Sequence, residues 1–569
     1  MLARYAIAFG RGRHRRALEE SADLAGLKIA SRGPELLAAV AATTPRSVLN
    51  EMIVIGRLFN ADRASLESRR ADFKFLSSAS SSRPLGESIW GNFACFFVQG
   101  GDWRVIRDPS GNVPVFQVGD GEDCLFVSDS RIACELGLLA SPSIDRDFAI
   151  HWLQYPRLLT SRTGLLHVTE LLPGQSLRFN RNRWTEEQAW SPWEHASMAH
   201  AITDRREAAR RLRATLLDVI ALQAKDDRHL LQLSGGLDSS IVAAALHEAK
   251  VPFEAVTFAT RTRDGDERRY AAAVADQCSA ELRQIAEADL QSFIDFQTEP
   301  RFRPGPNPIL AILEQAMRNA FEASGSTCLT DGGGGDNLFC YLSTATPTID
   351  ALIAGGVREA FCAIGNIAKL TGSNGWQVLQ AAATTLLTAR KRKPWREDRR
   401  FLLTDACLHS PDAHPWLKAP RRALPGKREH VEAIVHIHHF LERRTDGLTP
   451  ALHPLLAQPL LELCLSIPSW LWLEHGRDRA IAREAFEGLV PKIVMERRTK
   501  GSIQGFFYRT FERLRPQIAD SLLQGELGAL NILDLSAVEG ALDQDWRDDE
   551  IQLRLSELMS LELWLRSWR

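Results

Sequence analysis

The feature that most constrains the fold is a serine- and glycine-rich turn inside residues 230–246, between an apolar run and an alanine-rich stretch. The apolar residues predict a buried strand, and the alanine-rich stretch predicts a helix. Two adjacent glycines let the backbone approach a ligand, the serines add hydroxyl donors, and the helix start adds a partial positive charge. The turn therefore predicts a phosphate site. The residues expected to bind phosphates are Ser234, Gly235, Gly236, Asp238, Ser239 and Ser240.

The residue after the second glycine excludes the Walker A type of phosphate loop. That motif needs a lysine followed by Ser or Thr, and Leu237 stands there instead. The heptad SGGxDSS resembles the pyrophosphate loop of the ATP-pyrophosphatase superfamily, whose members cleave ATP to AMP and pyrophosphate. This resemblance implies ATP as the cofactor. A Gly/Ser turn without a ligand is the alternative, but such turns rarely coincide at all these positions.

Composition narrows the class of protein. A chain of 569 residues with 45% apolar content is long enough for two domains with packed cores. A net charge of −2 indicates no overall attraction to nucleic acid or anionic membranes. The nine cysteines never pair as CxxC, which favours neither a disulfide framework nor a zinc site. No apolar stretch approaches the ~20 residues of a membrane span, so we expect a cytoplasmic location.

The first part of the chain has the pattern of a β-rich domain. Short apolar runs, such as residues 93–98 and 124–128, are separated by turns rich in Gly, Asp and Pro. This pattern predicts a layered antiparallel module. A pattern-poor stretch at residues 184–200 predicts a linker, so we expect one domain at residues 1–190 and a second at residues 201–569.

The order of motifs in the β-rich part resembles the glutaminase domain of class II amidotransferases such as asparagine synthetase B. The motifs are GNFA at residues 91–94, RDPSGNVPV at residues 107–115, LFVSD at residues 125–129 and LLPG at residues 171–174. In that family an N-terminal Cys hydrolyses glutamine, whereas Leu2 and Ala3 stand here. Cys95 lies in an apolar strand pattern, which is typical of a packed thiol. We therefore expect a degenerate scaffold that makes no ammonia.

The second part begins with a helix pattern at residues 204–223 and continues with alternating strand and helix patterns. The strand expected at residues 253–258 is followed by an alanine-rich helix that opens near Asp266 and Glu267. These two acids resemble the Asp-Glu pair of asparagine synthetases, although carboxylates at a helix start are the more ordinary role. The fold class is α/β and α+β. It combines a glutaminase-like, Ntn-type layered β module with a pyrophosphate-loop ATPase domain that has a parallel sheet and a helical C-terminal part.

A second glycine-rich loop follows a short apolar strand pattern at residues 328–339. Its run of four glycines before Asp336 resembles the SGxGxDE-like motif of asparagine and β-lactam synthetases. Asp238 and Asp336, each after a strand, form a natural pair for Mg²⁺, which bridges substrate phosphates through one or two carboxylates. A flexible hinge is the alternative. The substrate-pocket residues expected here are Gly332, Gly333, Gly334 and Gly335.

The C-terminal third contains segments that resemble those of asparagine synthetase and follow one another in the same order. Residues 454–468 look like PFLD…LVEFALSIP, residues 476–485 look like the GK-LLREA segment, and Lys500 falls on the Lys of the KKGF-like motif. The resemblance implies that Lys500 is catalytic, and a buried lysine can stabilise an oxyanion and a departing phosphate. A surface lysine in a basic loop is the alternative.

The middle of the chain carries basic clusters and a histidine group. Solvated faces are the ordinary interpretation of both, and a peptide-binding role for the basic clusters and a metal site at the histidines are the alternatives. The clusters lie at residues 391–393, 399–400, 421–422 and 427–428, and the histidines are His436, His438 and His439.

Positions that differ from asparagine synthetase narrow the range of expected substrates. Ala457 stands where the family has Asp, and Pro450 and Leu452 stand where its SLEAR-like segment has Glu and Arg, so aspartate is not expected as substrate. Gly333 stands where β-lactam synthetase has the Tyr of its catalytic dyad. A glycine-rich loop on a chain without the N-terminal Cys resembles the macrolactam synthetases, or cyclases, of lasso-peptide biosynthesis.

That resemblance implies a function and partners. The expected reaction adenylates an Asp or Glu side chain of a precursor peptide and closes an isopeptide bond with the peptide's N-terminal amine, releasing AMP and pyrophosphate. The expected partners are the precursor, a leader peptidase and a leader-binding protein, without nucleic acid. A small-molecule amidoligase of the asparagine or β-lactam synthetase kind is the alternative. A non-catalytic protein with a decayed site is a third, which the intact phosphate loop, Asp336 and Lys500 disfavour.

Overall fold

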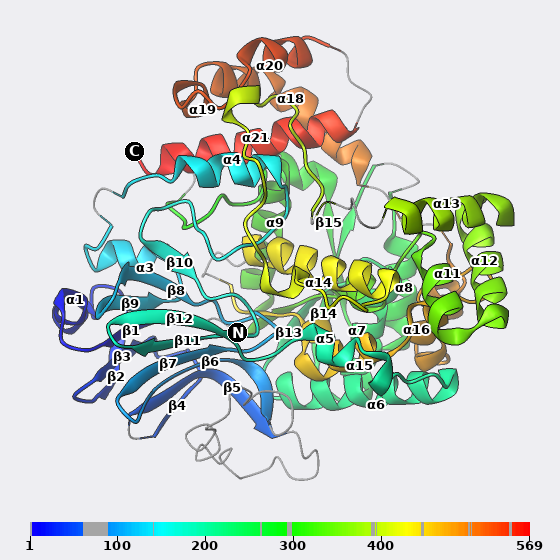
Figure 1. The fold of residues 1–569 in the computed structure, drawn as a ribbon, viewed down its shortest axis with the longest axis horizontal. Helices are drawn as coiled ribbons and strands as arrows, with labels where there is room; N and C mark the ends of the chain where they lie inside the picture. The colour runs from blue at the N-terminus through cyan, green and yellow to red at the C-terminus, as the bar shows by residue number, and fades with distance from the viewer. Residues whose placement is uncertain are drawn as a thin grey trace.

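Two antiparallel sheets and one parallel sheet organise the chain (Figure 1). The computed structural model describes residues 3–49, 51–60, 89–139, 142–261, 265–292, 299–388, 393, 395–444, 449–498, 501, 503–544 and 549–569. Among these residues, none of the helices combines the length and the apolar character that crossing a bilayer takes.

The antiparallel sheets confirm the layered β module expected in the first part of the chain. In order across the first sheet, the strands are β10 (Val168–Glu170), β8 (Phe116–Asp120), β9 (Asp123–Val127), β1 (Tyr5–Phe9), β3 (Leu36–Val40) and β2 (Lys28–Arg32). Across the second they are β12 (Arg183–Gln188), β11 (Gln175–Asn180), β7 (Asp102–Arg107), β6 (Ile89–Gln99), β5 (Met52–Asn60) and β4 (Arg46–Leu49). The helices beside these sheets are α1 (Arg13–Ser21), α3 (Ser130–Glu135) and α4 (Arg146–Gln154).

Strand β1 shows why the strands of this module have apolar residues at successive positions. Successive strand residues point to opposite faces of a sheet. Tyr5, Ile7 and Phe9 pack into the core between the two sheets. Ala6 and Ala8 belong to a second core that includes α4 and residues 506–565. Both faces of the strand are thus buried, so the alternation of polar and apolar residues is lost.

The linker prediction is wrong at its start, because residues 184–188 belong to strand β12. Trp184 donates its indole N–H to the carbonyl of Gly121 at 2.9 Å and packs near Phe9 and Phe126. The side chains of β12 are mostly exposed, as expected of an edge strand, which is why the sequence lacks an apolar period. The chain then continues through α5 (Pro192–His195) into α6 (Arg205–Gln223), the helix predicted at residues 204–223.

The parallel sheet confirms the βαβ alternation. Its strands in order are β15 (Leu282–Ala286), β14 (Phe253–Ala259), β13 (His229–Gln232), β16 (Cys328–Thr330) and β17 (Ala451–Leu452). The helices that follow its strands are α7 (Leu237–Glu248), α8 (Arg268–Gln277), α9 (Pro308–Ser324) and α10 (Gly335–Leu338). Leu230 of β13 packs with Met317 of α9, whereas Leu231 joins a core with α6 and α7. Helices therefore cover both faces of the sheet.

The remainder of the chain is helical, as predicted. Its helices are α11 (Thr346–Asp350), α12 (Val357–Thr371), α13 (Gly375–Thr388), α14 (Pro425–Arg444), α15 (Gln458–Ser466), α16 (Ala480–Ala485), α17 (Lys492–Met495), α18 (Gln504–Leu523), α19 (Glu526–Ala529), α20 (Leu535–Leu542) and α21 (Asp549–Ser567). Figure 1 shows α21 running beside α4, where Trp564 lies 6.1 Å from Phe148 between ring centroids. Residues far apart in the sequence thus share one core.

Candidate functional site

The strand order of the parallel sheet brings the two glycine-rich loops together. The chain runs outward from β13 to β14 and β15, then returns to the other side of β13 to form β16. The direction of winding therefore changes between β13 and β16. In open parallel sheets, ligands bind at this switch point, beyond the carboxyl ends of the strands. The loops after β13 and β16 both lie there.

The first loop has the backbone expected of an anion-binding turn. Gly235 has a φ of +70°, and a Cβ on it would lie 2.6 Å from Cβ of Tyr270, so only glycine fits. Gly236 is the extended residue before α7, whose first N–H groups therefore face outward. The hydroxyls of Ser239 and Ser240 donate to the carbonyl of Gly236 at 3.3 and 2.7 Å. These serines must rotate before they can donate to a phosphate.

Asp238 and Asp336 meet at the switch point, where a single arginine joins them. Nη1 of Arg479 lies 3.1 Å from both carboxylate oxygens of Asp238 and contacts Oδ1 of Asp336. The two carboxylates that the sequence paired for Mg²⁺ thus converge on one point. Arg479 itself was not among the predicted site residues. The signal available for it was its place in the charge-rich segment 476–479, directly before the helix that resembles the family's LLREA stretch.

The protein holds Arg479 in an unusual way. Its φ of +48° is in the left-handed region, which costs a residue with a side chain roughly 1–2 kcal/mol. Its Nε donates to Asp478 at 3.1 Å, and its guanidinium lies 5.4 Å from the ring centroid of Tyr341. Burial acts to lower the pKa of Arg479, but Asp238, Asp336 and Asp478 outweigh it and raise the pKa. The guanidinium therefore stays charged.

The second loop uses its glycines for close packing. A Cβ on Gly332 would lie 2.5 Å from the backbone nitrogen of Ser239, and one on Gly335 would lie 2.3 Å from Cγ of Asp238. Gly334 has a φ of +87° and faces Leu456. Two of the four glycines expected to open a substrate pocket, Gly332 and Gly335, are therefore required for the contact between the two loops, and Gly334 is required by its backbone and by Leu456. Gly333 is half-buried, and its N–H donates to Asp331, which also binds His453.

Glu267 connects the phosphate loop to the segment around Lys500. It forms a 2.7 Å ion pair with Arg497, and the N–H of Gly501 donates to the same carboxylate at 3.1 Å. Arg497 also lies 4.1 Å from the ring centroid of Tyr270, the residue that Gly235 contacts. Asp266, by contrast, binds Arg268 at the start of α8. Lys500 itself lies outside the described residues.

The histidines of α14 are core residues. His438 packs on Trp416 and His439 packs on Trp152, with ring centroids 5.1 and 4.7 Å apart. Burial lowers the pKa of His438 to about 3 and that of His436 to about 4. Across the described parts of the chain, no group of three or more His, Cys, Asp or Glu side chains is placed to hold a metal ion.

One of the basic clusters is also buried, unlike the solvated face expected from its sequence. The ammonium of Lys427 donates to the carbonyls of Leu465 and Ile467, each at 2.5 Å, at the end of α15. Burial lowers its pKa to about 8. Lys427 therefore satisfies a helix C-terminus inside the core. Arg421 and Arg422 are exposed, and residues 391 and 392 lie outside the described residues.

The positions at which the sequence resemblance expects the glutaminase nucleophile carry no thiol, since they are Leu2 and Ala3. Ala3 is buried, Leu2 lies outside the described residues, and Cys95 is fully buried in β6. Burial raises the pKa of the Cys95 thiol, which disfavours the reactive thiolate. Glu170 is a buried acid of the module, and it ion pairs with both Arg107 and Arg303.

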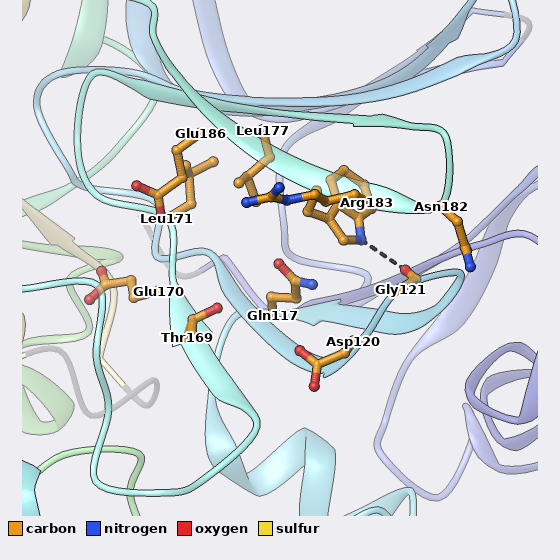
Figure 2. A pocket seen from close by; sticks show the side chains of 11 residues that line it. Gln117, Asp120, Gly121, Thr169, Glu170, Leu171, Leu177, Asn182, Arg183 and Glu186 are labelled. Carbon is orange, nitrogen blue, oxygen red and sulfur yellow. Dashed lines mark hydrogen bonds between the residues drawn. The ribbon is translucent and has the colours of Figure 1, made fainter.

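A cavity of about 330 Å³ opens beside this cluster, at the edge of the two sheets. Figure 2 shows Gln117, Thr169 and Asp120 on one side of it and Arg183 on the opposite side. Glu170 lines it, but the two arginines hold that carboxylate ionised and paired, so it is unsuited to accept a proton. Lining residues of this cavity do not coincide with the site residues predicted from the sequence.

The geometry at the switch point fits Mg²⁺ held with a nucleotide. The carboxylates of Asp238 and Asp336 both face the guanidinium of Arg479, so they can face another cation. Mg²⁺ prefers oxygen ligands and usually keeps several of its coordination positions for water and phosphate. The ion would be held by Asp238 and Asp336, beside the N–H groups at the start of α7. A third protein ligand is not required when substrate phosphates supply the remaining oxygens.

Comparison with known proteins gives one family. Residues 211–566 match the family described as asparagine synthase. The match includes both loops, Arg479 and Lys500. None of the curated proteins matches the chain.

Solved structures that match include three enzymes at low identity. The allosteric regulatory enzyme of purine biosynthesis has 11% identity and a TM-score of 0.21, covering 50% of this chain and 80% of that one. Glutamine phosphoribosylpyrophosphate amidotransferase from B. subtilis, complexed with ADP and GMP, has 12% identity and a TM-score of 0.21, and the match covers 50% of this chain and 81% of that one. A U34-tRNA thiolase from Methanococcus maripaludis with its 4Fe–4S cluster has 16% identity and a TM-score of 0.17, and the match covers 42% of this chain and 74% of that one.

Proposed function

The chain belongs to the asparagine synthase family, whose members are ATP-dependent, AMP-forming C–N ligases, and from that premise we propose that it is a macrolactam cyclase of the lasso-peptide kind. In this proposal it adenylates an Asp or Glu side chain of a precursor peptide and closes an isopeptide bond with the N-terminal amine. The observation that carries the catalytic part is the convergence of Asp238 and Asp336 on one point beside the phosphate loop.

The described residues have defined tasks in the adenylation step. The N–H groups of the first loop and the serine hydroxyls bind phosphate oxygens, and the start of α7 favours their negative charge. Asp238 and Asp336 would hold Mg²⁺, which neutralises phosphate charge while pyrophosphate departs. We assign Lys500 to the oxyanion and the departing phosphate. Glu267 supports that assignment, because it binds both Arg497 and Gly501 on either side of Lys500.

The nitrogen must come with the substrate. The β module, which we take as a degenerate glutaminase-like domain at residues 1–190, has Leu2 and Ala3 where the nucleophile belongs, and Cys95, the first cysteine of the sequence, is fully buried. A peptide α-amine has a pKa of ~7.7–8.0 and is partly neutral at cellular pH, so a strong base is not required. The synthetase domain, residues 201–569 in this proposal, then has to hold amine and acyl-adenylate together, a contribution of up to ~7–11 kcal/mol.

The test is a reaction of purified protein with ATP, Mg²⁺ and a leader-cleaved precursor peptide. We expect AMP and pyrophosphate, and a peptide product that is lighter by one water in mass spectrometry. A leader peptidase and a leader-binding protein are added where the full precursor is used. Release of ADP, or AMP formation without loss of water from the peptide, contradicts the proposal.

Two variants separate binding from ring closure. Lys500→Ala should still bind ATP but form no ring, because it lacks the cation for the oxyanion. Gly333→Tyr should exclude the peptide by bulk. Gly365→Tyr on exposed α12, where an added Cβ meets nothing within 4 Å, is the matched control and should cyclise normally. Ring formation by Gly333→Tyr at the parent rate contradicts the idea that this loop faces the peptide.

The packing of the glycine loop favours a second candidate. Because Gly332, Gly334 and Gly335 are committed to contacts with Ser239, Leu456 and Asp238, only part of the expected space is open. A smaller acyl substrate, as in a small-molecule amidoligase, fits that observation. AMP formation that depends on a free amino acid or β-amino acid, and not on a peptide, would support this candidate over the first.

A further inference from the structure

Arg479 stands where the proposed nucleotide site needs a divalent cation. One atom, Nη1, contacts both oxygens of Asp238 and one of Asp336. The side chain of Arg479 is 12% exposed, so little water screens these contacts. A guanidinium and a divalent cation cannot bind the same oxygens together, because both are positive and both need the same lone pairs.

Arg479 also has contacts that do not depend on these two aspartates. Its Nε donates to Asp478, and its guanidinium lies against the ring of Tyr341, which is 45% exposed. Asp478 is fixed in turn by Arg483 at 3.2 Å. The left-handed backbone of Arg479 is a conformation that glycine would adopt more readily, so the contacts of its side chain have to offset a backbone cost. The guanidinium therefore has a place to remain when it leaves Asp238 and Asp336.

We infer that Arg479 is a built-in counter-cation that holds Asp238 and Asp336 together in the nucleotide-free enzyme and competes with the divalent cation that accompanies ATP. The inference rests on the proposed function for the presence of ATP. It predicts two effects of opposite sign when Arg479 loses its charge. The bare carboxylates attract a divalent cation more strongly, and they repel the phosphates of metal-free ATP more strongly.

The experiment measures these two affinities in the full-length protein. Binding of Mn²⁺ without nucleotide is followed by the electron paramagnetic resonance signal of free Mn²⁺, and binding of ATP in excess chelator is followed by calorimetry. For Arg479→Gln we expect Mn²⁺ to bind at least tenfold more tightly and metal-free ATP at least tenfold more weakly. Arg477→Gln is the matched control, because it removes an exposed arginine from the same segment, and both affinities should stay within twofold.

The outcomes distinguish a counter-cation from a structural residue. If Arg479 only maintains the shape of the site, both affinities weaken in Arg479→Gln, which overturns the inference, as does unchanged Mn²⁺ binding. Arg479→Lys keeps the charge and should stay within about threefold of the parent for both ligands; if it behaves like the Gln variant, the inference is also wrong. The Mn²⁺ measurement needs no turnover, so it stands or fails independently of whether the enzyme forms AMP or a ring.

Discussion

Two clusters of arginines and carboxylates, one around Glu170 and one around Arg479, differ in their exposure to water and in their balance of charges. Glu170 of the β module, whose side chain is 0% exposed, is bound by two arginines, Arg107 of the same module and Arg303 from the second part of the chain. At the switch point of the parallel sheet, Arg479 contacts three aspartates, and Asp336 is 33% exposed. The first cluster is closed to water and its acid is fully paired. The second has more carboxylates than arginines and opens to solvent.

This difference separates a charge that stabilises the fold from charges that can bind a ligand. Burial acts to raise the pKa of Glu170, but Arg303 and Arg107 lower it overall, so the acid stays ionised in the core. A carboxylate that is buried and paired with two arginines is not available to bind a substrate. In the proposed nucleotide site the aspartates around Arg479 could exchange partners without leaving a bare buried charge, because solvent and a nucleotide's cation would replace the guanidinium. The predictions below test this contrast.

The largest effect is expected from the open cluster. Asp238→Ala or Asp336→Ala should abolish AMP formation, a loss of at least roughly 10⁴-fold or about 5 kcal/mol, because the cation that accompanies the phosphates loses an oxygen ligand. Release of pyrophosphate from ATP measures this loss. Asp266→Asn, which removes an acid bound to Arg268 outside the cluster, should retain activity. Substantial AMP formation by either alanine variant would place the nucleotide elsewhere.

The closed cluster should respond in stability. Glu170→Gln leaves two buried arginines without their acid and should lower the free energy of unfolding by about 3–5 kcal/mol. Urea unfolding followed by circular dichroism measures the change. Glu299→Gln, from an ion pair in which Glu299 is 64% exposed, should change it by less than about 1 kcal/mol. Equal effects in the two variants would show that the buried cluster has no special role.

Acidification should lower the free energy of unfolding through the buried histidines on and around α14, by less per histidine than the loss expected for Glu170→Gln. Burial lowers the pKa of His414, His430 and His438 to about 3, whereas the unfolded value is about 6.5. Between these values only the unfolded chain binds the protons, so stability falls as pH falls. At pH 5 the loss is on the order of 2 kcal/mol per histidine.

Urea unfolding at pH 7.5 and pH 5.0 measures this slope. His438→Phe keeps the contact with Trp416 and should remove one histidine's share of the loss. His167→Phe, whose ring is 75% exposed in the parent, should leave the slope nearly unchanged. An unaltered slope in His438→Phe would mean that His438 is not neutral in the folded protein.

The smallest effect is expected at Cys95. Cys95→Ser or Cys95→Ala should leave AMP formation unchanged, and the parent should release neither glutamate nor ammonia from glutamine. Coupled glutamate detection measures this. Measurable glutaminase activity that is lost in Cys95→Ala would make the β module a working glutaminase.

The sequence was most informative where structure is local. Turn residues and helix starts are encoded within a few positions, so the loop after β13, the helix α6 and the strand β14 follow the predicted ranges closely. The meeting of Asp238 and Asp336 was also predictable, because the carboxyl ends of parallel strands share an edge. What the sequence could not give is which charge would join them. Arg479 lies 241 residues from Asp238, and no local pattern encodes that pairing.

The same limit explains the errors in the middle of the chain. Lys427 follows the helix start of α14 and looks like part of a basic surface, yet its ammonium binds carbonyls at the end of α15. Burial of a polar group is decided by what packs over it, which is a property of the tertiary structure. The sequence predicts a linker where strand β12 lies, because an edge strand with exposed side chains has no alternation of apolar and polar residues.

The shared core of residues 6–168 and 506–565 has a consequence in time during synthesis. The chain makes α4 early, but α21, a helix that packs against it, comes more than 300 residues later. At about 5–20 residues per second, the apolar face of α4 is exposed for tens of seconds before α21 exists. A nascent chain in this interval presents that face to any chaperone or to another nascent chain. The yield of native protein therefore depends on how the ribosome-bound half is protected, and slower translation of the intervening segment lengthens the exposure.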